Sequence, residues 1–467
     1  MNMKARFIYL GGIILAASCM FLSCSKDDIK EKDTPAPVVD PAPESPEDNP
    51  SEDDPTIDDS QPFYIKNKYN LQVIEDGEAT TDPNELKRET LTEDETEVID
   101  AINVFSFNLF HKIYETGDAG QNLFISPYSV QQFMSVLANA AGEATRKQIL
   151  SVLQYDGELS KYNACNKVIK NLLEKKQNIF SKMVVSNALW VNKDKPVYQS
   201  FLSVIRNFYD ADVFAMLFDS QDAGKAINSW CSDKTNGLIN EIVDDGPLPY
   251  NLFLANAVYF FSGWSNEFDE SLTAKEDFTN VNGEIKKVDM MRWPAACAVA
   301  HASLENMDAV CLPLNSYFGM MVCLPHKDVG MNACMGQLDA AVWKKLLESL
   351  EYKMVDVRLP KYKMNKQLML TDVLIKLGTG NIFLSDDAFA RMTPAILSLD
   401  AVFQTSTIFV NEKGTEAAAV TGGWASSNGE EQEEHPVTEF KVDRPFFFCI
   451  YDRTIGTTLF MGAVNQL

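Results

Sequence analysis

The length, composition and charge of the chain exclude several classes of protein. It has 467 residues, of which 46% are hydrophobic, and its formal net charge is −25 at pH 7. The apolar content suffices for a sizeable core, in one large domain or in two or three. The acidic balance argues against nucleic acid and against an anionic membrane surface as partners held by charge.

Histidine and cysteine usage argues against a metal centre. The chain has four histidines and nine cysteines, and no two cysteines form a CxxC pair. Cys311, Cys323 and Cys449 lie in apolar runs, which is typical of buried free thiols. Cys297 and His301 have the i, i+4 spacing of one helical face, but two ligands do not make a site. We expect no metal ion and no cofactor.

No catalytic constellation is present either. A nucleophile must be activated by a neighbouring base, and no G-x-S-x-G turn or glycine-rich phosphate loop occurs. The four histidines lie in unremarkable settings: His111, His301, His326 and His435. We therefore expect that the protein is not an enzyme.

The N-terminus has the build of a secretory signal. Basic residues precede an uncharged, mostly apolar run from Phe7 to Ser23, which is borderline in length for a single transmembrane anchor. Phe21–Cys24 resembles a lipoprotein-processing box, and Cys24–Asp28 resembles the acidic surface-export signal of Bacteroidota lipoproteins. We expect residues 1–23 to be a signal peptide and Cys24 to be lipidated, with Cys19 as the alternative.

Composition divides the rest of the chain. Residues 25–62 hold 13 acidic and 3 basic residues, with eight prolines from residue 29 on, so 24–62 is predicted to be an extended tether. The range 63–96 is a linker or an N-terminal extension, with a short strand possible at Phe63–Ile65. Residues 97–467 show no repeat and no composition shift, which indicates one domain.

Elements in this domain indicate an α+β fold, because helices come first and long strands mixed with helices follow. Val98, Ile102, Phe105 and Leu109 form one apolar face of a helix over 97–114. The further expected elements are a strand ending at Ser126 and a helix from Pro127 to about Asn139; a helix over 144–153; a strand over 184–191; a helix with a break in 227–243; a strand over 252–261; a hairpin of 311–314 with 318–324; a helix over 339–350; and a strand over 355–359.

One segment near the C-terminus fits neither a core nor an ordinary loop. It follows the strand-like run Thr405–Val410 and consists mainly of Ala, Gly, Ser and Thr up to Gly429. If it is extended from Thr415 on, every second residue faces one side, and all of these are small. Small side chains suit a strand that enters a packed sheet, because overpacking is costly. A flexible linker is the alternative.

Several motifs, in order, resemble those of the serpin family over about residues 97–467. Glu412–Ala419 resembles the proximal hinge of its reactive-centre loop. The other motifs are 122–129, 187–190, 227–230 with 235–239, 256–264, 359–361, 443–446 and 459–462. The resemblance implies three β-sheets, eight to nine helices and an exposed loop at about 412–436.

The resemblance also implies a function. Such a protein is a suicide substrate of serine proteases, sometimes of cysteine proteases: the protease cleaves the loop, forms an acyl-enzyme, and is trapped when the loop inserts into the central sheet. It implies a monomer whose partner is the target protease, with a membrane contact through the lipid anchor only. A non-inhibitory serpin that serves as a surface binding module is the alternative.

The resemblance assigns roles to individual residues. The hinge comprises Glu412, Gly414, Thr415, Glu416, Ala417, Ala418 and Ala419. At the breach, where the sheet opens, Glu412 is expected to pair with Lys361 under Trp264. The shutter, a polar cluster that lets the sheet part, comprises Ser126, Ser129, Asn256 and Gln404. The family usually has histidine at the position of Gln404, so a pH response there would be lost.

The reactive bond is the least constrained feature. The spacing from Gly414 predicts Asn428–Gly429, whereas counting back from Pro445 leads to Glu434. Trp424, Ala425 and Ser426 are alternatives for chymotrypsin-like or elastase-like enzymes. No Lys or Arg lies between Gly414 and Lys441, which excludes trypsin-like specificity.

Overall fold

A computed structural model of the chain defines the architecture. It describes residues 89–117, 120–178, 181–314, 317–397, 399, 402–415 and 436–467. The signal peptide, Cys19, Cys24, the tether and the possible strand at Phe63–Ile65 lie outside the described residues. The domain boundaries therefore stay predictions.

Ten α-helices occur in the described part of the chain. α1 (Glu93–Thr116) begins four residues before the predicted start, because Thr92 and Glu95 form a reciprocal capping box. Pro127 opens α2 with Ser126 as its cap, as expected. The others are α3 (Glu143–Val152), α4 (Leu159–Lys175), α5 (Gln199–Tyr209), α6 (Ala223–Lys234), α7 (Met331–Met335), α8 (Ala340–Glu348), α9 (Thr371–Leu377) and α10 (Asn381–Leu384), with α2 ending at Ala140.

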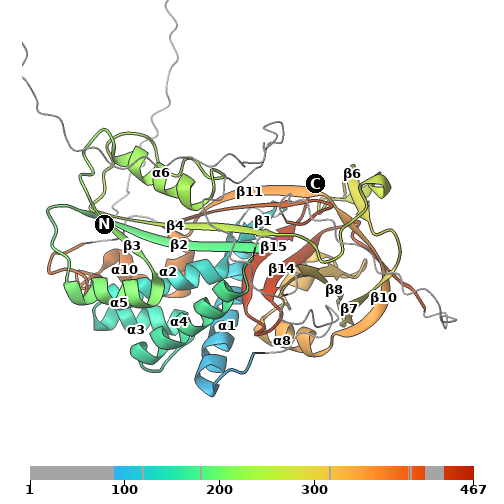
Figure 1. Cartoon of the computed structure of the whole chain (residues 1–467), viewed down its shortest axis with the longest axis horizontal. Coiled ribbons are helices and arrows are strands. Elements are labelled where there is room, and N and C mark those ends of the chain that lie inside the picture. Colours follow the sequence, from blue (N-terminus) through green and yellow to red (C-terminus); the bar gives the residue numbers. More distant parts are fainter. Residues whose placement is uncertain are drawn as a thin grey trace, which may run out of the picture. The chain divides into compact units, whose positions relative to one another are not determined.

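A five-stranded sheet positions the candidate site. Its order is β11 (Tyr362–Met369), β12 (Phe403–Val410), β4 (Leu252–Ser262), β2 (Ser181–Asn192) and β3 (Asp212–Met216). β4 and β2 pair antiparallel along eleven residue pairs. β12 runs parallel to β4, and this pair is in register only at Gln404↔Asn256 and Thr405↔Ala257. In Figure 1, α2 to α5 cover one face of this sheet and α6 lies over the other.

The remaining strands form one ten-stranded network. The strands are β1 (Leu123–Ile125), β5 (Ala274–Thr279), β6 (Ile285–Arg292), β7 (Cys297–Ser303), β8 (Met307–Leu314), β9 (Phe318–Pro325), β10 (Glu351–Pro360), β13 (Thr438–Lys441), β14 (Phe446–Asp452) and β15 (Thr458–Val464). The α+β fold is confirmed, but the described residues form two hydrogen-bonded sheets, not three. β10 joins what would be separate sheets, because it pairs with β7, with β6 and with β13. The helix count exceeds the expected eight to nine because α7 and α10 have only five and four residues.

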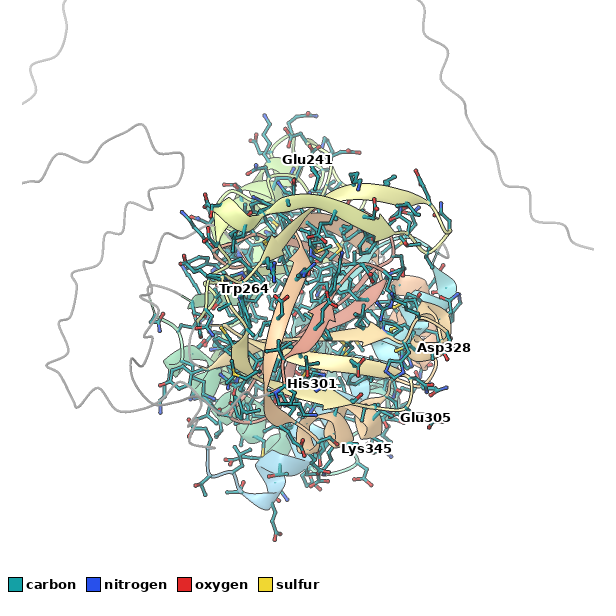
Figure 2. All side chains as sticks on the ribbon, turned by 90° about the vertical axis from the view of Figure 1, so that its right-hand side faces the viewer. Glu241, Trp264, His301, Glu305, Asp328 and Lys345 are labelled. Atoms are coloured by element: carbon teal, nitrogen blue, oxygen red, sulfur yellow. The ribbon has the colours of Figure 1, made fainter. Side chains whose placement is uncertain are left out.

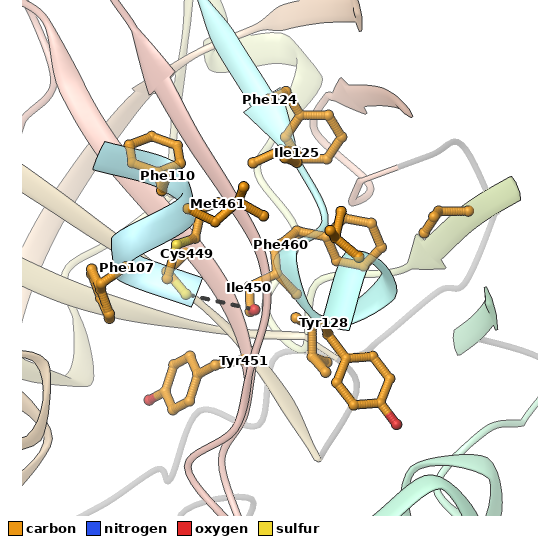
Figure 3. Close-up of a cluster of buried hydrophobic side chains, with 14 of the residues drawn as sticks. Phe107, Phe110, Phe124, Ile125, Tyr128, Cys449, Ile450, Tyr451, Phe460 and Met461 are labelled. Carbon is orange, nitrogen blue, oxygen red and sulfur yellow. Dashed lines mark hydrogen bonds between the residues drawn. The ribbon is translucent and has the colours of Figure 1, made fainter. Parts of the chain in front are cut away.

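The main core lies between α1, α2 and the ten-stranded sheet. Figure 3 shows Phe107 and Phe110 of α1 close to β14 and β15, with Phe124 beside Phe460. Cys311, Cys323 and Cys449 are buried free thiols, as predicted. A second, smaller apolar cluster lies under α6, where Trp230 packs edge-on against Trp190 of β2.

A buried ion pair fastens the end of α4 to the turn between β14 and β15. Lys176 Nζ lies 2.7 Å from Asp452 Oδ2, and the two side chains are 4% and 0% exposed. Lys176 also donates to Thr454 Oγ1, and Asp452 Oδ1 accepts from the Thr454 and Ile455 backbone N–H groups. Every charge is thus bonded, and removal of one partner would leave the other charge buried and unpaired.

Replacement of Lys176 by Met is therefore expected to destabilise the fold by about 3–5 kcal/mol, because Asp452 keeps a buried charge. The matched control is Lys147→Met, which removes an exposed i, i+4 pair with Glu143 and should change stability by less than about 0.5 kcal/mol. Urea unfolding followed by circular dichroism measures both. Equal effects of the two substitutions would contradict this account of the ion pair.

Candidate functional site

The chain reverses direction just after β12. The Asn411 backbone N–H donates to the Gly414 carbonyl oxygen at 2.9 Å. The Asn411 side-chain oxygen accepts from the backbone N–H groups of Lys413 at 2.9 Å and Gly414 at 3.1 Å. This turn, residues 411–414, directs the following residue back toward the five-stranded sheet.

Thr415 lies between two strands of that sheet. Its backbone N–H donates to the Ser262 carbonyl of β4 at 2.9 Å, and its carbonyl accepts from the Phe409 N–H of β12 at 3.3 Å. The Thr415 hydroxyl bonds Ser262 as well, accepting from its N–H at 3.0 Å and donating to its carbonyl at 3.1 Å. Thr415 is 1% exposed. It therefore lies between the ends of β4 and β12 and is hydrogen bonded to both.

The space next to Thr415 is bounded by β4 and β12, which do not pair with each other there. Beyond Thr405↔Ala257, no described β4–β12 pair continues toward Ser262 and Val410. The incoming direction of Thr415 is antiparallel to both neighbours, as the bridges Gly263↔Gly414 and Asn411↔Gly414 show. The arrangement can receive a further strand whose residues follow Thr415.

The predicted breach contacts are present. Lys361 Nζ donates to Glu412 Oε2 at 2.9 Å, and Thr273 Oγ1 donates to Glu412 Oε1 at 2.9 Å. Trp264 holds the turn from the other side: its Nε1 donates to the Asn411 carbonyl at 2.8 Å and its backbone N–H donates to the Lys413 carbonyl at 2.9 Å. Burial of Glu412 favours its neutral form, but the Lys361 and Thr273 bonds outweigh it and lower the pKa of Glu412 below its ordinary 4.5.

The predicted shutter residues also meet. The backbone N–H of Ser126 donates to Gln404 Oε1 at 2.9 Å, and Gln404 Nε2 donates to Asn256 Oδ1 at 3.1 Å. Ser129 Oγ donates to the same Asn256 oxygen at 2.6 Å. The prediction omitted one member: Asn256 Nδ2 donates to Asn187 Oδ1 of β2 at 2.8 Å. Because Asn187 and Asn256 lie directly opposite in register, strand pairing would have revealed it.

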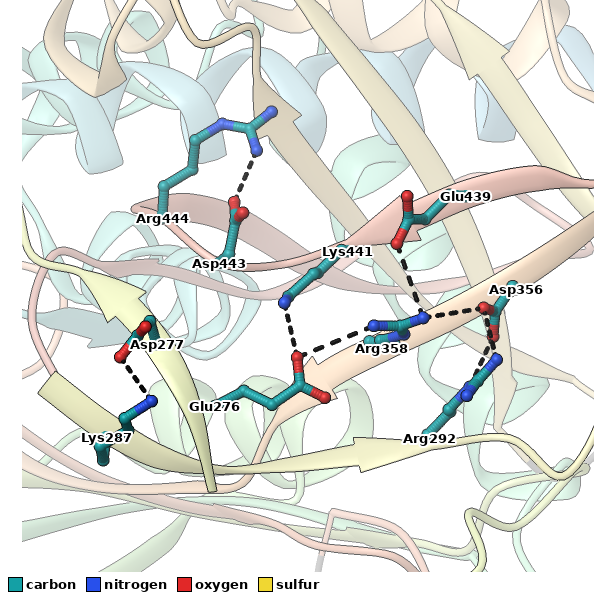
Figure 4. Close-up of polar contacts among 10 residues, drawn as sticks. All are labelled: Glu276, Asp277, Lys287, Arg292, Asp356, Arg358, Glu439, Lys441, Asp443 and Arg444. Carbon is teal, nitrogen blue, oxygen red and sulfur yellow. Dashed lines mark hydrogen bonds and ion pairs between the residues drawn. The ribbon is translucent and has the colours of Figure 1, made fainter. Parts of the chain in front are cut away.

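An ion-pair network lies where the chain resumes after the loop, and sequence reasoning missed it (Figure 4). β13 pairs in parallel with β10 along four residues. Lys441 of β13 forms an ion pair with Glu276 of β5, and Glu439 lies 3.7 Å from Arg358 of β10. Arg358 also lies 3.8 Å from Glu276. The charges converge through pairing of β13 with a distant strand, which residue spacing alone does not indicate.

Several predicted site residues lie outside the described part of the chain. These are the hinge residues Glu416, Ala417, Ala418 and Ala419 and the reactive-bond candidates Trp424, Ala425, Ser426, Asn428 and Gly429. Their roles stay predictions.

The spacing of Cys297 and His301 does not bring them together. Both lie on strand β7, not on a helix, so four residues separate them by about 13 Å along the strand. Figure 2 shows His301 away from Trp264. Among the described residues, no group of three or more His, Cys, Asp or Glu side chains could hold a metal ion. None of the described helices has the length and apolar character needed to cross a membrane.

The lowered pKa of Glu412 predicts that the stability of the fold depends on pH. Its pKa is lowered in the fold, so its contribution is present above the ordinary value of 4.5 and is lost as pH falls through the folded-state pKa. Glu412→Gln should cost roughly 1–2 kcal/mol at pH 7, and the cost should shrink as pH falls below 4.5. Urea midpoints of both proteins from pH 7 to 3 measure this; a difference that does not shrink in acid would contradict the assignment.

Gly414 predicts a steric effect. Its φ is +156°, and a Cβ there would lie 2.3 Å from the Ser262 carbonyl oxygen. Gly414→Ala should therefore destabilise the native state by at least about 1–3 kcal/mol and displace Thr415 from the sheet. Gly380→Ala is the control, since a Cβ at Gly380 meets nothing within 4 Å. Thermal unfolding of both variants decides, and equal midpoints would contradict the tight approach of Gly414 to β4.

Comparison with known proteins gives a consistent picture. A family model described as Serpin (serine protease inhibitor) matches residues 100–467. An uncharacterized serpin-like protein of Thermococcus kodakarensis is 31% identical over 374 residues, covering 79% of this chain and 86% of the relative. Heparin cofactor 2 of Rattus norvegicus is 28% identical over 370 residues, covering 77% of this chain and 75% of the relative.

Solved structures share the fold. The thermophilic serpin Tengpin in the native state has a TM-score of 0.72 and 26% identity, covering 82% of this chain and 96% of that chain. Human thyroxine-binding globulin in complex with thyroxine has a TM-score of 0.70 and 24% identity, covering 80% of this chain and 99% of that chain, which shows the fold alone. With the family model and the thermococcal relative both spanning most of its length, the chain belongs to the serpin family.

Proposed function

We propose that this protein is a suicide-substrate inhibitor of serine endopeptidases that are elastase-like, chymotrypsin-like or subtilisin-like, with cysteine proteases as further targets. The observation that supports this proposal most directly is the hydrogen bonding of Thr415. Its backbone bonds to both β4 and β12, while these two strands share only two residue pairs. A residue that hydrogen bonds to both strands supports the proposal that a longer insertion would begin there. In this proposal the catalytic residues belong to the target, and this chain is not itself an enzyme.

The proposed reaction uses the protease's own chemistry. Its nucleophile attacks the carbonyl carbon of the reactive bond, the peptide C–N bond breaks, and the new amino terminus leaves with β13. The chain on the hinge side stays joined to the protease as an acyl-enzyme. This freed chain then enters between β4 and β12, gains backbone hydrogen bonds on both edges, and carries the protease with it.

The breach and shutter residues have matching roles in this proposal. Residues 411–414 form the pivot, since Asn411, Trp264 and Lys361 hold them while the chain beyond Thr415 moves. The Gln404–Asn256 bond at 3.1 Å joins β12 to β4 and must yield when the strands part. Gln404 and Asn256 do not ionise near neutral pH, so this step should be insensitive to pH there.

The loop composition supports the target class. Between Gly414 and Lys441 there is no Lys or Arg, which disfavours trypsin-like proteases. Asn428–Gly429 is the proposed reactive bond, with cleavage at Trp424, Ala425 or Ser426 as the alternatives. The acidic run Glu430–Glu434 would lie beyond the proposed bond and favour a target with a basic rim.

The N-terminus supports a place of action. We propose an outer-membrane lipoprotein, exposed at the cell surface, whose lipid on Cys24 (alternatively Cys19) is its only membrane contact. The acidic tether 24–62 would hold the serpin domain, as a monomer, away from the membrane. Mass spectrometry of the N-terminal peptide from the native host tests this: an unmodified Cys24 and Cys19 would overturn it.

A non-inhibitory binding module is the second candidate. The observation that favours it is structural: thyroxine-binding globulin, solved with its ligand, shares the fold. The small residues of the proposed insertion face, which would be unnecessary in a binding module, favour inhibition.

One experiment separates the two. The whole protein is mixed with neutrophil elastase, cathepsin G, chymotrypsin and subtilisin, and denaturing gels follow the products. Inhibition predicts a covalent band at the summed mass and a cleaved form with a higher unfolding temperature; mass spectrometry of the released C-terminal peptide locates the bond. Cleavage without a complex and without thermal stabilisation would refute inhibition.

A charge in the insertion face provides a matched test. Thr415→Arg should convert the inhibitor into a substrate and reduce complex formation at least tenfold, because the buried Thr415 site cannot hold a guanidinium. Glu416→Arg adds the same side chain one residue later, on the face predicted to point outward, and should keep inhibition. The gel assay with the preferred protease measures both; persistent inhibition by the Thr415 variant would contradict the insertion mechanism.

A further inference from the structure

An open groove of about 960 Å³ lies between α3, the start of α4 and α5. Leu150, Leu159 and Val204 supply apolar parts of its lining, one from each of these helices. Its volume is in the range of clefts that bind ligands. The turn at 411–414, the breach and the shutter use none of its residues, so the proposed insertion does not explain it.

The groove carries positive charge beside α3. Arg146 of this helix lines the groove together with Arg391, whose backbone N–H donates to the Ala140 carbonyl at 3.0 Å, just before α3. We call these two residues the arginine pair. Neither guanidinium group forms an ion pair with a described residue. Glu143 is bonded to Lys147 at 3.2 Å and attracts the arginine pair only at longer range. Both guanidinium groups can therefore take an acidic partner.

The acidic part of the groove lies beside the start of α1. Asp156 and Glu158 line the groove from the α3–α4 loop and form no ion pair with a described residue; we call them the acidic loop. Three residues after Glu158, Lys161 of α4 pairs with Asp94 of α1 at 2.6 Å. The described chain before α1 begins at Glu89, five residues from Asp94. Because five residues reach at most about 18 Å, the chain that precedes Glu89 can reach the groove.

The segment that precedes the described chain carries charges in the matching order. Residues 78–88, the entry segment, read Glu-Ala-Thr-Thr-Asp-Pro-Asn-Glu-Leu-Lys-Arg. Its basic end, Lys87 and Arg88, is nearest to α1 and therefore to the acidic loop. Its acidic part, Asp82 and Glu85, comes farther from α1. Opposite charges can thus meet at both parts of the groove, which a purely acidic or purely basic ligand would not achieve.

We propose that the entry segment docks in this groove, with its basic end at the acidic loop and its acidic part at the arginine pair. Leu86 stands between the two charged parts in sequence and can cover Leu150 and Leu159 of the groove. The occupant is this chain's own segment, because a covalent connection gives it a high effective concentration that a free peptide lacks. The range 78–88 is then part of the folded domain and not a linker.

Docking in the groove would fix where the tether leaves the serpin domain. α5, which lines the groove, follows the Asn192 end of β2. Thr415 bonds to Ser262, which is paired with Ser181 at the other end of β2. Eleven residue pairs join β2 to β4, so the two ends are about 33 Å apart. This consequence rests on the proposed function and its lipid anchor: the loop would be presented on the side of the domain away from the membrane.

Carbodiimide cross-linking of the whole chain at low salt tests the contact, because the reagent joins a carboxylate directly to a neighbouring lysine amine. We expect Lys147 to be joined to the acidic part of the entry segment, and Lys87 to the acidic loop, both within the monomer. The ion pair of Lys161 with Asp94 serves as the internal standard. Mass spectrometry of the peptides identifies each link.

A charge reversal in the groove provides the matched variants. Arg146→Glu with Arg391→Glu should reduce both cross-links about tenfold and leave the internal standard unchanged, since it removes two contacts between opposite charges. Arg206→Glu is the control, because it makes the same substitution at an exposed position of α5 outside the groove lining. The control should leave the cross-links unchanged.

Trypsin supplies a second readout that leaves the groove intact. Asp82→Asn with Glu85→Gln should undock the entry segment and make cleavage after Arg88 about tenfold faster, while cleavage after Lys68, outside the segment, keeps its rate. Absence of the cross-links, links found only in a dimer, which would assign the groove to a second copy, or an unchanged rate after Arg88 would overturn the docking. Both readouts are independent of protease inhibition, so failure of the docking and failure of the proposed function are distinguishable.

Discussion

The incomplete pairing of β4 with β12 is the constraint on which the other features of the site depend. Two neighbouring strands of a buried sheet would normally share hydrogen bonds along their length, yet these share two residue pairs. Thr415 occupies the near end of the interval and the Gln404–Asn256 bond closes the far end. The turn at 411–414, the Glu412–Lys361 contact and the Gln404–Asn256 bond thus surround one interval in which β4 and β12 do not pair.

The sequence predicted the elements whose pattern is local. The Ser126–Pro127 helix start, the β4 strand and the 311–324 hairpin follow from capping, apolar runs and turn residues. Helix α4 was missed because its apolar residues are interrupted by Asn and Lys. Strands β3 and β5 have five and six residues, of which one each is buried, so they carry little alternation. The number of sheets depends on β10, whose three partners come from distant parts of the chain.

The candidate site likewise contains some contacts that the sequence predicts and others that it does not. Glu412 with Lys361, and Ser129 with Asn256, could be predicted because family motifs name both partners. The position of Thr415 could not, since it depends on where β4 ends and on the room that Gly414 leaves beside Ser262. The ion-pair network around Arg358 could not be predicted either, because its members come from three strands. Physical contact between segments far apart in the chain is the step that residue patterns do not supply.

Different interactions hold the two ends of the loop. At the hinge, backbone hydrogen bonds and buried groups hold Thr415, and dissolved ions reach these poorly. At β13, the Lys441–Glu276 and Arg358–Glu439 pairs are partly exposed, and salt screens such pairs over a Debye length of about 8 Å at physiological ionic strength. Ionic strength therefore acts on the ion pairs at both ends, Lys361–Glu412 and Lys413–Glu270 included, while the buried hydrogen bonds of Thr415 are insensitive to it. At the β13 end, the salinity of the surroundings sets how firmly the chain is held.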